Sequence, residues 1–239
     1  YQPVIELNTG LCAGAEALIS WVQPGGKRVR PDLFIPLAED TGLIEPMTEW
    51  LMKQIRVELE ALLASNRSFH IAINLSPCHF ESEKVLNTSS RVFGTSAIMP
   101  DQIIYEITER GLIEEDNEVA RSVMKKLRER NSGIALDDFG TGYSSLSYIS
   151  SFPLDYLKID KRFVDAIGVD SPMAGIVDSI IDMAKRLDLR TIAEGVETRE
   201  QAEHLRARGV DYVQGWYYSR ALTASGLINF LRKSVTDQP

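Results

Sequence analysis

The sequence has only two cysteines and lacks any long apolar run. Cys12 and Cys78 lie far apart and form no paired spacing, which argues against a disulfide framework or a zinc site and favours a reducing compartment. No stretch of about 18 consecutive apolar residues is present and no signal peptide is visible, so we expect no membrane span within this chain. These absences favour a cytoplasmic domain, either free or attached to a membrane-anchored remainder.

Positive charge is also in short supply. The 239 residues include 34 Asp and Glu against 26 Lys and Arg, which gives a net charge of -8. A protein that binds the nucleic-acid backbone in general is normally basic, so the sequence argues against that class. An anionic substrate would need local cations, such as metal ions, lysines or helix N-termini.

The chain shows no low-complexity segment and no linker. Its length suits one large α/β domain or two small ones, and in the absence of a linker we predict a single domain over residues 1–239. Because the sequence opens at Tyr1 directly into a strand-like run, we expect it to be the C-terminal part of a longer protein.

Short apolar runs alternate with amphipathic segments along the chain. The predicted strands are residues 1–7, 13–21, 69–75, 103–107, 134–137, 156–159, 190–193 and 212–213. The predicted helices are residues 32–39 with Asp32 as N-cap, 43–64, 77–93, 117–130, a short helix after Tyr143, 171–187, 199–208 and 225–232. Short apolar strands that alternate with helices are typical of parallel β/α units buried on both faces of the sheet.

Roughly eight strands in a chain of this length predict a TIM-like barrel. The first two strands read as a hairpin, so one of them should run antiparallel to its neighbours. A doubly wound open sheet is the alternative, although the chain has no G-x-G-x-x-G after its first strand.

Two adjacent acids, Asp137 and Asp138, end a short apolar strand and precede a glycine-rich turn. Carboxylates at the end of a buried strand are costly because each loses hydration and because like charges repel. A cation between them removes this cost, and paired Asp oxygens suit Mg²⁺ or Mn²⁺. Taken alone, the pair is equally well explained by a helix cap at Asp138 and a solvated acid at Asp137.

Polar side chains stand at or near the ends of seven of the predicted strands: Glu16, Asn74, Glu106, Asp137 with Asp138, Lys158 with Asp160, Glu194 and Gln214. In a parallel barrel these positions converge on the C-terminal mouth, where TIM-barrel active sites lie. A mouth so rich in acids would repel itself without cations, so we expect divalent metal there. The three histidines, His70, His79 and His204, do not cluster with these acids and read as ordinary strand and helix residues.

The same positions carry a resemblance to a known family. The tripeptide Glu16-Ala17-Leu18 resembles the signature of the EAL-domain cyclic di-GMP phosphodiesterases, and the match continues in order through residues 74–76, 105–109, 137–146, 157–160, 193–197 and 214–215. The resemblance implies a modified TIM (β/α)8 barrel with an antiparallel first strand. It also implies hydrolysis of cyclic di-GMP to linear pGpG with two divalent cations, Mg²⁺ or Mn²⁺.

The resemblance implies a role for each polar strand end. The residues that match ligands of the first metal are Glu16, Asn74, Glu106 and Asp137, with Asp137 bridging to a second metal that Asp138 also holds. Two metals about 3.5–4 Å apart can activate water and stabilise the leaving oxygen of an in-line displacement.

The remaining matches are to catalytic and supporting residues. Lys158 matches the lysine that contacts the nucleophilic water, and Glu194 matches an acid near that water and the second metal. The supporting matches are Gln214, Glu109, which would steady the loop after Asp138, and the acids Asp160 and Glu197. A simple salt bridge from Lys158 to Asp160 or its neighbours is the alternative reading of that lysine, and it does not exclude the catalytic role.

Ser20 departs from the family pattern, which commonly has an arginine there that meets a substrate phosphate. A charge-assisted hydrogen bond contributes about 1.5–3 kcal/mol, so its loss should weaken substrate binding. The sequence therefore leaves three hypotheses open. The chain is an active phosphodiesterase, a catalytically weak module that binds cyclic di-GMP or a protein partner as a sensor, or an enzyme for another phosphodiester. The resemblance also implies a homodimer through the helices around the glycine-rich loop.

Overall fold

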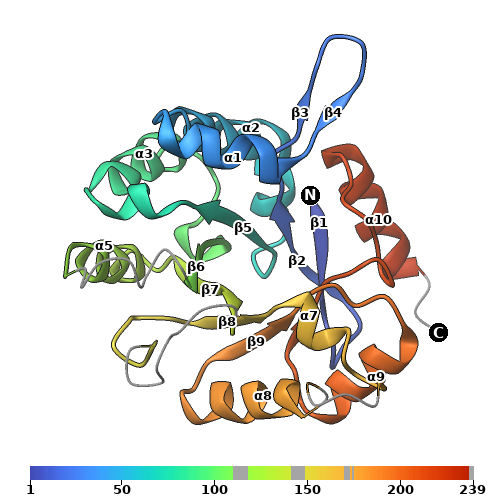
Figure 1. Ribbon diagram of the computed structural model, residues 1–239. Coiled ribbons are helices and arrows are strands. Elements are labelled where there is room, and N and C mark those ends of the chain that lie inside the picture. The colour runs from blue at the N-terminus through green and yellow to red at the C-terminus, as the bar shows by residue number, and fades with distance from the viewer. Residues whose placement is uncertain (110–117, 141–148, 170–172, 174, 237–239) are drawn as a thin grey trace.

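The computed structural model describes residues 1–109, 118–140, 149–169, 173 and 175–236. Within them, eight strands close into a barrel in the order β1-β10-β9-β8-β7-β6-β5-β2 (Figure 1). These strands are β1 (Gln2–Glu6), β2 (Cys12–Ala17), β5 (His70–Leu75), β6 (Ile103–Thr108), β7 (Gly133–Phe139), β8 (Tyr156–Ile159), β9 (Arg190–Ala193) and β10 (Tyr212–Val213). The closed barrel confirms the predicted fold class and excludes the open doubly wound sheet.

Strand β1 runs antiparallel to both of its neighbours. It pairs with β2 through Pro3 and Ala15 and with β10 through Ile5 and Val213, whereas every other neighbouring pair in the barrel is parallel. A short turn joins β1 to β2, and so tight a connection can only produce an antiparallel pair. The antiparallel first strand that the sequence predicts is therefore confirmed.

Helices surround the barrel. They are α1 (Pro31–Asp40), α2 (Ile44–Ser65), α3 (Lys84–Phe93), α5 (Glu118–Glu129), α7 (Lys161–Val164), α8 (Ile176–Arg186), α9 (Arg199–Ala207) and α10 (Ala224–Thr236), with 3₁₀ helices η1 (Pro77–Phe80) and η2 (Pro100–Gln102). A two-stranded hairpin, β3 (Trp21–Val22) with β4 (Arg28–Val29), projects away from the barrel (Figure 1). Among the described residues, no helix combines the length and apolar character that a membrane crossing requires.

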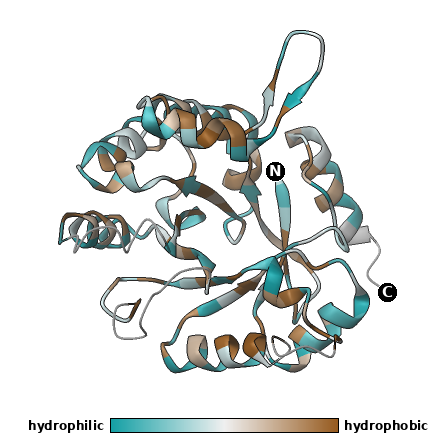
Figure 2. Ribbon diagram, in the orientation of Figure 1, coloured by the Kyte–Doolittle hydropathy of each residue, from teal (hydrophilic) through white to brown (hydrophobic). Residues whose placement is uncertain are grey.

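The main core lies between the barrel and the helices. Helix α2 contributes Met52, Ile55, Leu59 and Leu63, all fully buried, at the three- and four-residue steps that place side chains on one face of a helix. Figure 2 shows hydrophobic residues along the strands and on parts of the surrounding helices. This layer fixes the angular position of each strand and so of each strand end.

Three local expectations need correction. The second strand, predicted over residues 13–21, ends at Ala17, because residues 18–20 leave the sheet before the separate β3–β4 hairpin begins. The helix predicted over residues 77–93 is two elements, because η1 ends at Phe80 and α3 starts only at Lys84. Asp32 is not the N-cap of α1; the cap is Arg30, whose guanidinium pairs with Asp32 at 2.7 Å.

The short helix expected after Tyr143 lies outside the described residues. For the helix expected over residues 171–187, the described part is α8, which begins at Ile176.

The buried side chain of Gln102 connects the barrel to α2, and replacing it tests how much this connection contributes to stability. Its Nε2 lies 3.0 Å from Leu63 O and 3.0 Å from Asn66 O, and its Oε1 accepts from Met99 N at 3.1 Å. We expect Gln102→Met to lower the free energy of unfolding by about 2–3 kcal/mol, because buried backbone groups lose their partners. Urea unfolding followed by circular dichroism measures this.

The exposed Gln23 provides the matched control. We expect Gln23→Met to change the free energy of unfolding by less than about 0.5 kcal/mol, as is usual for surface substitutions. Equal effects of the two substitutions would show that Gln102 does not hold these segments together.

Candidate functional site

Side chains alternate between the interior and the exterior of the barrel along each strand. At the mouth, the inward-facing positions form a layer of polar side chains. A small interior cluster consists of Ala72, Ile104, Ala135, Tyr156 and Ile192, one residue from each strand from β5 to β9. Two residues further along the chain, at the end of each strand or just beyond it, lie Asn74, Glu106, Asp137, Lys158 and Glu194. The polar side chains of the mouth therefore lie next to this apolar cluster, toward the carboxyl ends of the strands.

The ammonium group of Lys158 lies among four carboxylates of this mouth. Its Nζ is 2.8 Å from Glu106 Oε2, 2.8 Å from Glu194 Oε1, 3.0 Å from Asp137 Oδ2 and 3.7 Å from Glu16 Oε2. The Lys158 side chain is 1% exposed. We refer to these five residues as the Lys158 cluster. The alternative partner, Asp160, is not among the lysine's ion-pair partners.

Burial and charge act in opposite directions on the cluster. Burial alone would lower the pKa of Lys158, but the surrounding acids, Asp137 and Glu106 foremost, raise it well above its usual value. Burial would likewise raise the pKa of Glu16, and Lys158 with hydrogen bonds from Gln214 holds it below its usual value. The lysine is therefore charged at neutral pH.

The other acids are short of positive charge. Burial raises the pKa of Glu106 well above its usual range, and Lys158 only partly offsets this effect. Burial also raises the pKa of Glu194 to about 8, and burial together with the neighbouring Asp137 raises that of Asp138 to about 6. The single ammonium group of Lys158 does not compensate the cost of burying this many carboxylates.

Two amides complete the mouth. Asn74 Nδ2 donates to Glu16 Oε1 at 2.6 Å, and Gln214 Nε2 donates to Glu16 Oε2 at 2.6 Å and lies 3.3 Å from Glu194 Oε1. Gln214 is buried, and its Oε1 has no hydrogen-bond partner among the described residues. A buried acceptor of this kind calls for a donor or a cation.

A bulge brings both acids of the adjacent pair to the same side of β7. Leu136 pairs with Leu157 and Phe139 with Ile159, so β7 has one residue more than β8 between these pairs. Asp138 occupies the left-handed region at φ 55°, which is uncommon for a residue other than glycine. Successive side chains of a regular strand point to opposite faces, and the extra residue removes that alternation here.

Asp137, Asp138 and Glu194 form a candidate metal centre. Each offers a carboxylate oxygen, and the three oxygens lie within 4.8 Å of one another. Oxygen donors of this kind fit Mg²⁺ or Mn²⁺, as do the raised pKa values and the unpartnered Gln214 oxygen beside them. The residues present therefore fit a divalent cation.

Glu109 contacts the backbone that follows the acid pair. Its Oε2 accepts a hydrogen bond from Gly140 N at 2.9 Å, and its side chain is buried. Gly140 has φ 87°, and a Cβ there would lie 2.7 Å from Phe163 Cζ. A hydrogen bond from this backbone to Glu109 is the contact that a restraint on the segment requires. The role of Glu109 in steadying the loop stays a prediction.

Three other predicted residues lie outside the Lys158 cluster. Asp160 caps α7 by accepting from Arg162 N at 2.8 Å, although its charge contributes to the raised pKa of Asp138. Glu197 pairs with Lys161 at 2.9 Å in a half-exposed position. Ser20 is exposed and lines an apolar groove over α1 and α2 that contains none of the acids.

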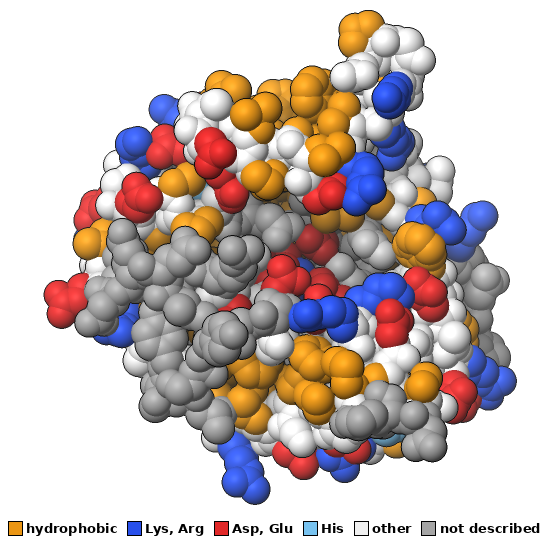
Figure 3. Space-filling model, viewed as in Figure 1, with side chains coloured by type: hydrophobic (Ala, Val, Ile, Leu, Met, Phe, Trp, Pro, Cys, Tyr) orange, Lys and Arg blue, Asp and Glu red, His pale blue; other side chains and the backbone are white. Residues whose placement is uncertain are grey.

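A cavity of about 340 Å³ opens beside the mouth. Its walls come from the ends of β2 and β5 and from α1 and α2, and they include Leu18, Ile35, Glu39 and Asn74. Figure 3 shows acidic side chains gathered in a hollow of this face, with hydrophobic side chains above them. The sequence does not identify Ile35 or Glu39 as cavity residues, because no local pattern reveals where α1 packs.

Comparisons with known proteins agree with this geometry. The model of the EAL domain family matches residues 1–221. Two curated relatives from Escherichia coli (strain K12) are similar: the "Probable cyclic di-GMP phosphodiesterase PdeB", 43% identical over 93% of this chain, and the "Cyclic di-GMP phosphodiesterase PdeL", 41% identical over 95%. The chain spans only 42% and 63% of their lengths.

Solved structures are similar as well. The PaMucR phosphodiesterase in complex with c-di-GMP is 34% identical, with a TM-score of 0.88 over 95% of this chain and 92% of that one. The fold is thus shared with this structure, and the family match extends over residues 1–221.

The Lys158 cluster generates a stability test in the presence of a chelator. We expect Lys158→Met to lower the free energy of unfolding by about 3–5 kcal/mol, because removing one partner leaves buried charges uncompensated. The neighbouring Lys161 forms half-exposed ion pairs with Asp165 and Glu197, so Lys161→Met should cost no more than about 1 kcal/mol. Urea unfolding of both variants measures the difference, and equal losses would contradict the central position of Lys158.

Proposed function

The chain belongs to the EAL-domain family, and on that basis we propose that it hydrolyses cyclic di-GMP to linear pGpG. The observation that carries the proposal is the Lys158 cluster: one buried ammonium among four carboxylates at the barrel mouth, with Asp138, Asn74 and Gln214 beside it. The names of the relatives and the c-di-GMP complex of the PaMucR phosphodiesterase support the choice of substrate. The chain spans only part of the length of these relatives, so any activity of the whole protein is likewise a proposal.

The residues that would hold two divalent cations, Mg²⁺ or Mn²⁺, are Glu16, Asn74, Glu106, Asp137 and Asp138. When bound, such cations neutralise the phosphodiester and supply hydroxide near neutral pH. In the reaction, water adds to one phosphorus and the bond from that phosphorus to the 3′ oxygen breaks. One 5′ phosphate and one 3′ hydroxyl result, as linear pGpG requires.

Lys158 and Glu194 would position the attacking water. Lys158 Nζ lies 2.8 Å from Glu194 Oε1 and 3.0 Å from Asp137 Oδ2, so its N–H groups and these acceptors converge on one small volume. The three N–H groups of Lys158 are directed at Glu106, Glu194 and Asp137, so an attacking water would take the place of the direct Lys158–Glu194 contact, accepting from Lys158 and donating to Glu194. Burial excludes other water, which strengthens these contacts.

The cavity beside the mouth would take a guanine base. Its apolar walls include Leu18 and Ile35, and Glu39 is among the lining residues. A carboxylate can accept two hydrogen bonds, and guanine offers the N1–H and N2–H donors on one edge. Asn74 lines the same cavity and contacts Glu16, which connects the proposed base site to the acids.

A catalytically weak module that binds cyclic di-GMP or a protein partner is the second candidate, and Ser20 is the observation that favours it. The exposed hydroxyl of Ser20 replaces the guanidinium that the family pattern leads one to expect there. Among the described residues that line its groove with Trp21 and Phe34, none is a lysine or an arginine. Weaker binding of the phosphate would follow from either candidate, so turnover distinguishes them.

The wider setting of the chain is also proposed. We propose that it acts in the cytoplasm, where cyclic di-GMP would be the substrate. A homodimer through the helices around residues 137–146 stays a prediction, and most of that segment lies outside the described residues.

Product analysis tests the proposed reaction. We expect the purified chain to convert cyclic di-GMP to pGpG with Mg²⁺ or Mn²⁺, as measured by anion-exchange chromatography. Glu16→Gln should lower kcat more than about 100-fold, beyond the 10–100-fold usual for residues that only support a ligand. Glu6→Gln on β1, whose carboxylate accepts from Thr9 at 2.6 Å, should leave the rate unchanged.

Absence of pGpG from folded protein with either metal would eliminate the enzyme. Binding of cyclic di-GMP without turnover would then select the sensor reading.

Glu39 tests the proposed base site. We expect Glu39→Gln to raise KM about tenfold, because a charge-assisted hydrogen bond is worth about 1.5–3 kcal/mol, while kcat changes little. The adjacent Asp40, also exposed, does not line the cavity, so Asp40→Asn should not change KM. A matching rise in both variants would indicate a general charge effect instead of base recognition.

A further inference from the structure

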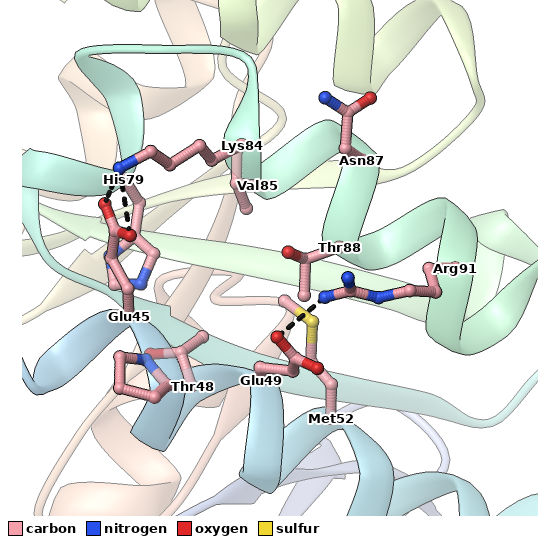
Figure 4. Close-up of a pocket in the computed structure, with 11 residues that line it drawn as sticks. Glu45, Thr48, Glu49, Met52, His79, Lys84, Val85, Asn87, Thr88 and Arg91 are labelled. Carbon is pink, nitrogen blue, oxygen red and sulfur yellow. Dashed lines mark hydrogen bonds and ion pairs between the residues drawn. The ribbon is translucent and has the colours of Figure 1, made fainter.

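A second cleft lies between α2 and α3, on the outside of the barrel (Figure 4). Its volume is about 350 Å³, and its lining includes the buried side chains of Met52, Val85 and His79. Thr48 lines both this cleft and the cavity beside the mouth, so the two are neighbours with one shared wall. None of the residues of the Lys158 cluster lines it.

His79 brings an unpartnered polar atom to this cleft. The side chain is 5% exposed, and its Nδ1 lies 3.1 Å from both Ser76 N and Ser76 O. The backbone N–H of Ser76 can only donate, and Ser76 O already accepts from His79 N at 3.0 Å, so we assign Nδ1 as the acceptor and place the ring proton on Nε2. Burial lowers the pKa of His79, which keeps the ring neutral at pH 7.

The Nε2–H donor has no hydrogen-bond partner among the described residues. Buried donors without acceptors are costly and rare in folded proteins. The position therefore calls for an acceptor from outside the chain, either solvent or a ligand.

The walls of the cleft carry opposite charges in matched pairs. Glu45 and Glu49 lie one turn apart on α2, facing Lys84 and Arg91 on α3. Lys84 pairs with Glu45 at 3.1 Å and Arg91 with Glu49 at 2.7 Å. Figure 4 shows the first pair beside His79 and the second beside Met52. Such partly exposed ion pairs are weak, so a ligand can exchange them for its own charges.

We infer that this cleft binds a small zwitterion of the amino-acid type with an apolar side chain. The carboxylate accepts hydrogen bonds from His79 Nε2–H and Lys84, and the ammonium group meets Glu49 toward the opposite end. The apolar side chain packs on Met52 and Val85. A simple anion would be repelled by the two glutamates, and a simple cation would leave the His79 donor without an acceptor.

The imidazole ¹⁵N spectrum of the protein tests this inference. The chain has three histidines, and His70→Asn and His204→Asn variants assign the His79 signals by elimination. In the free protein we expect the Nε2-protonated form of His79. We expect L-leucine to shift the Nε2 signal until it saturates, in the absence of any cyclic dinucleotide.

Matched probes separate the two charges of the ligand. 4-Methylpentanoate lacks the ammonium group of leucine and isoamylamine lacks its carboxylate, so each should bind at least about tenfold more weakly. Lys84→Ala should weaken leucine binding by about the same factor. Lys53→Ala is the control, because Lys53 also pairs with a glutamate of α2, at 2.6 Å from Glu49, but does not line the cleft.

Several results would overturn the inference. An Nδ1-protonated His79 in the free protein would remove the unpartnered donor. A His79 signal that leucine does not move would leave water as the only occupant of the cleft. Equal shifts with all three compounds, or equal binding by the Lys84→Ala variant, would show that the paired charges do not recognise a zwitterion.

Discussion

The mouth of this barrel depends on one interaction, the contact between the Lys158 ammonium and the carboxylates around it. Three of these carboxylates lie within 3.0 Å of Nζ, and the lysine is almost fully buried. Desolvation of the acids costs more than a single positive charge returns, which is why the pKa values of Glu106 and Glu194 stay above their usual range. A fold would not retain such an arrangement for stability alone, and clusters of this kind are typical of functional sites.

The barrel holds this cluster together by alternation. Each strand from β5 to β9 places an apolar side chain inside the barrel and, two residues later, a polar one at the mouth. The hydrogen-bonded register sets the polar residues side by side, as in the pairing of Asn74 with Glu106. The amide groups of Asn74 and Gln214 bind Glu16 without adding charge. The geometry of the site is therefore a consequence of the same strand period that builds the core.

Much of this could be predicted from the sequence. Apolar strands alternating with helices gave the barrel, and the hairpin at the start required an antiparallel strand. The sequence did not identify the partners of Lys158, because spacing along the chain does not specify which strand ends meet across a closed barrel. His79 was read as an ordinary residue, because its unpartnered Nε2 is visible only once Ser76 N and the cleft are placed. The break between η1 and α3 is not evident from the sequence, because residues 81–83 include neither glycine nor proline.

The pair Asp137 and Asp138 can be recognised in the sequence, but the backbone geometry that lets both acids face one site is visible only in the structure. Two neighbouring carboxylates cannot reach one metal centre from a regular strand, because their side chains point to opposite faces. The extra residue in β7 and the left-handed backbone of Asp138 remove this obstacle, at a cost of about 1–3 kcal/mol in backbone strain. The hydrogen bond from Gly140 N to Glu109 secures the next residues, and the approach of Phe163 excludes a side chain at position 140. The order Asp-Asp-Phe-Gly thus follows from the bulge, and the bulge follows from the need to place two acids on one face.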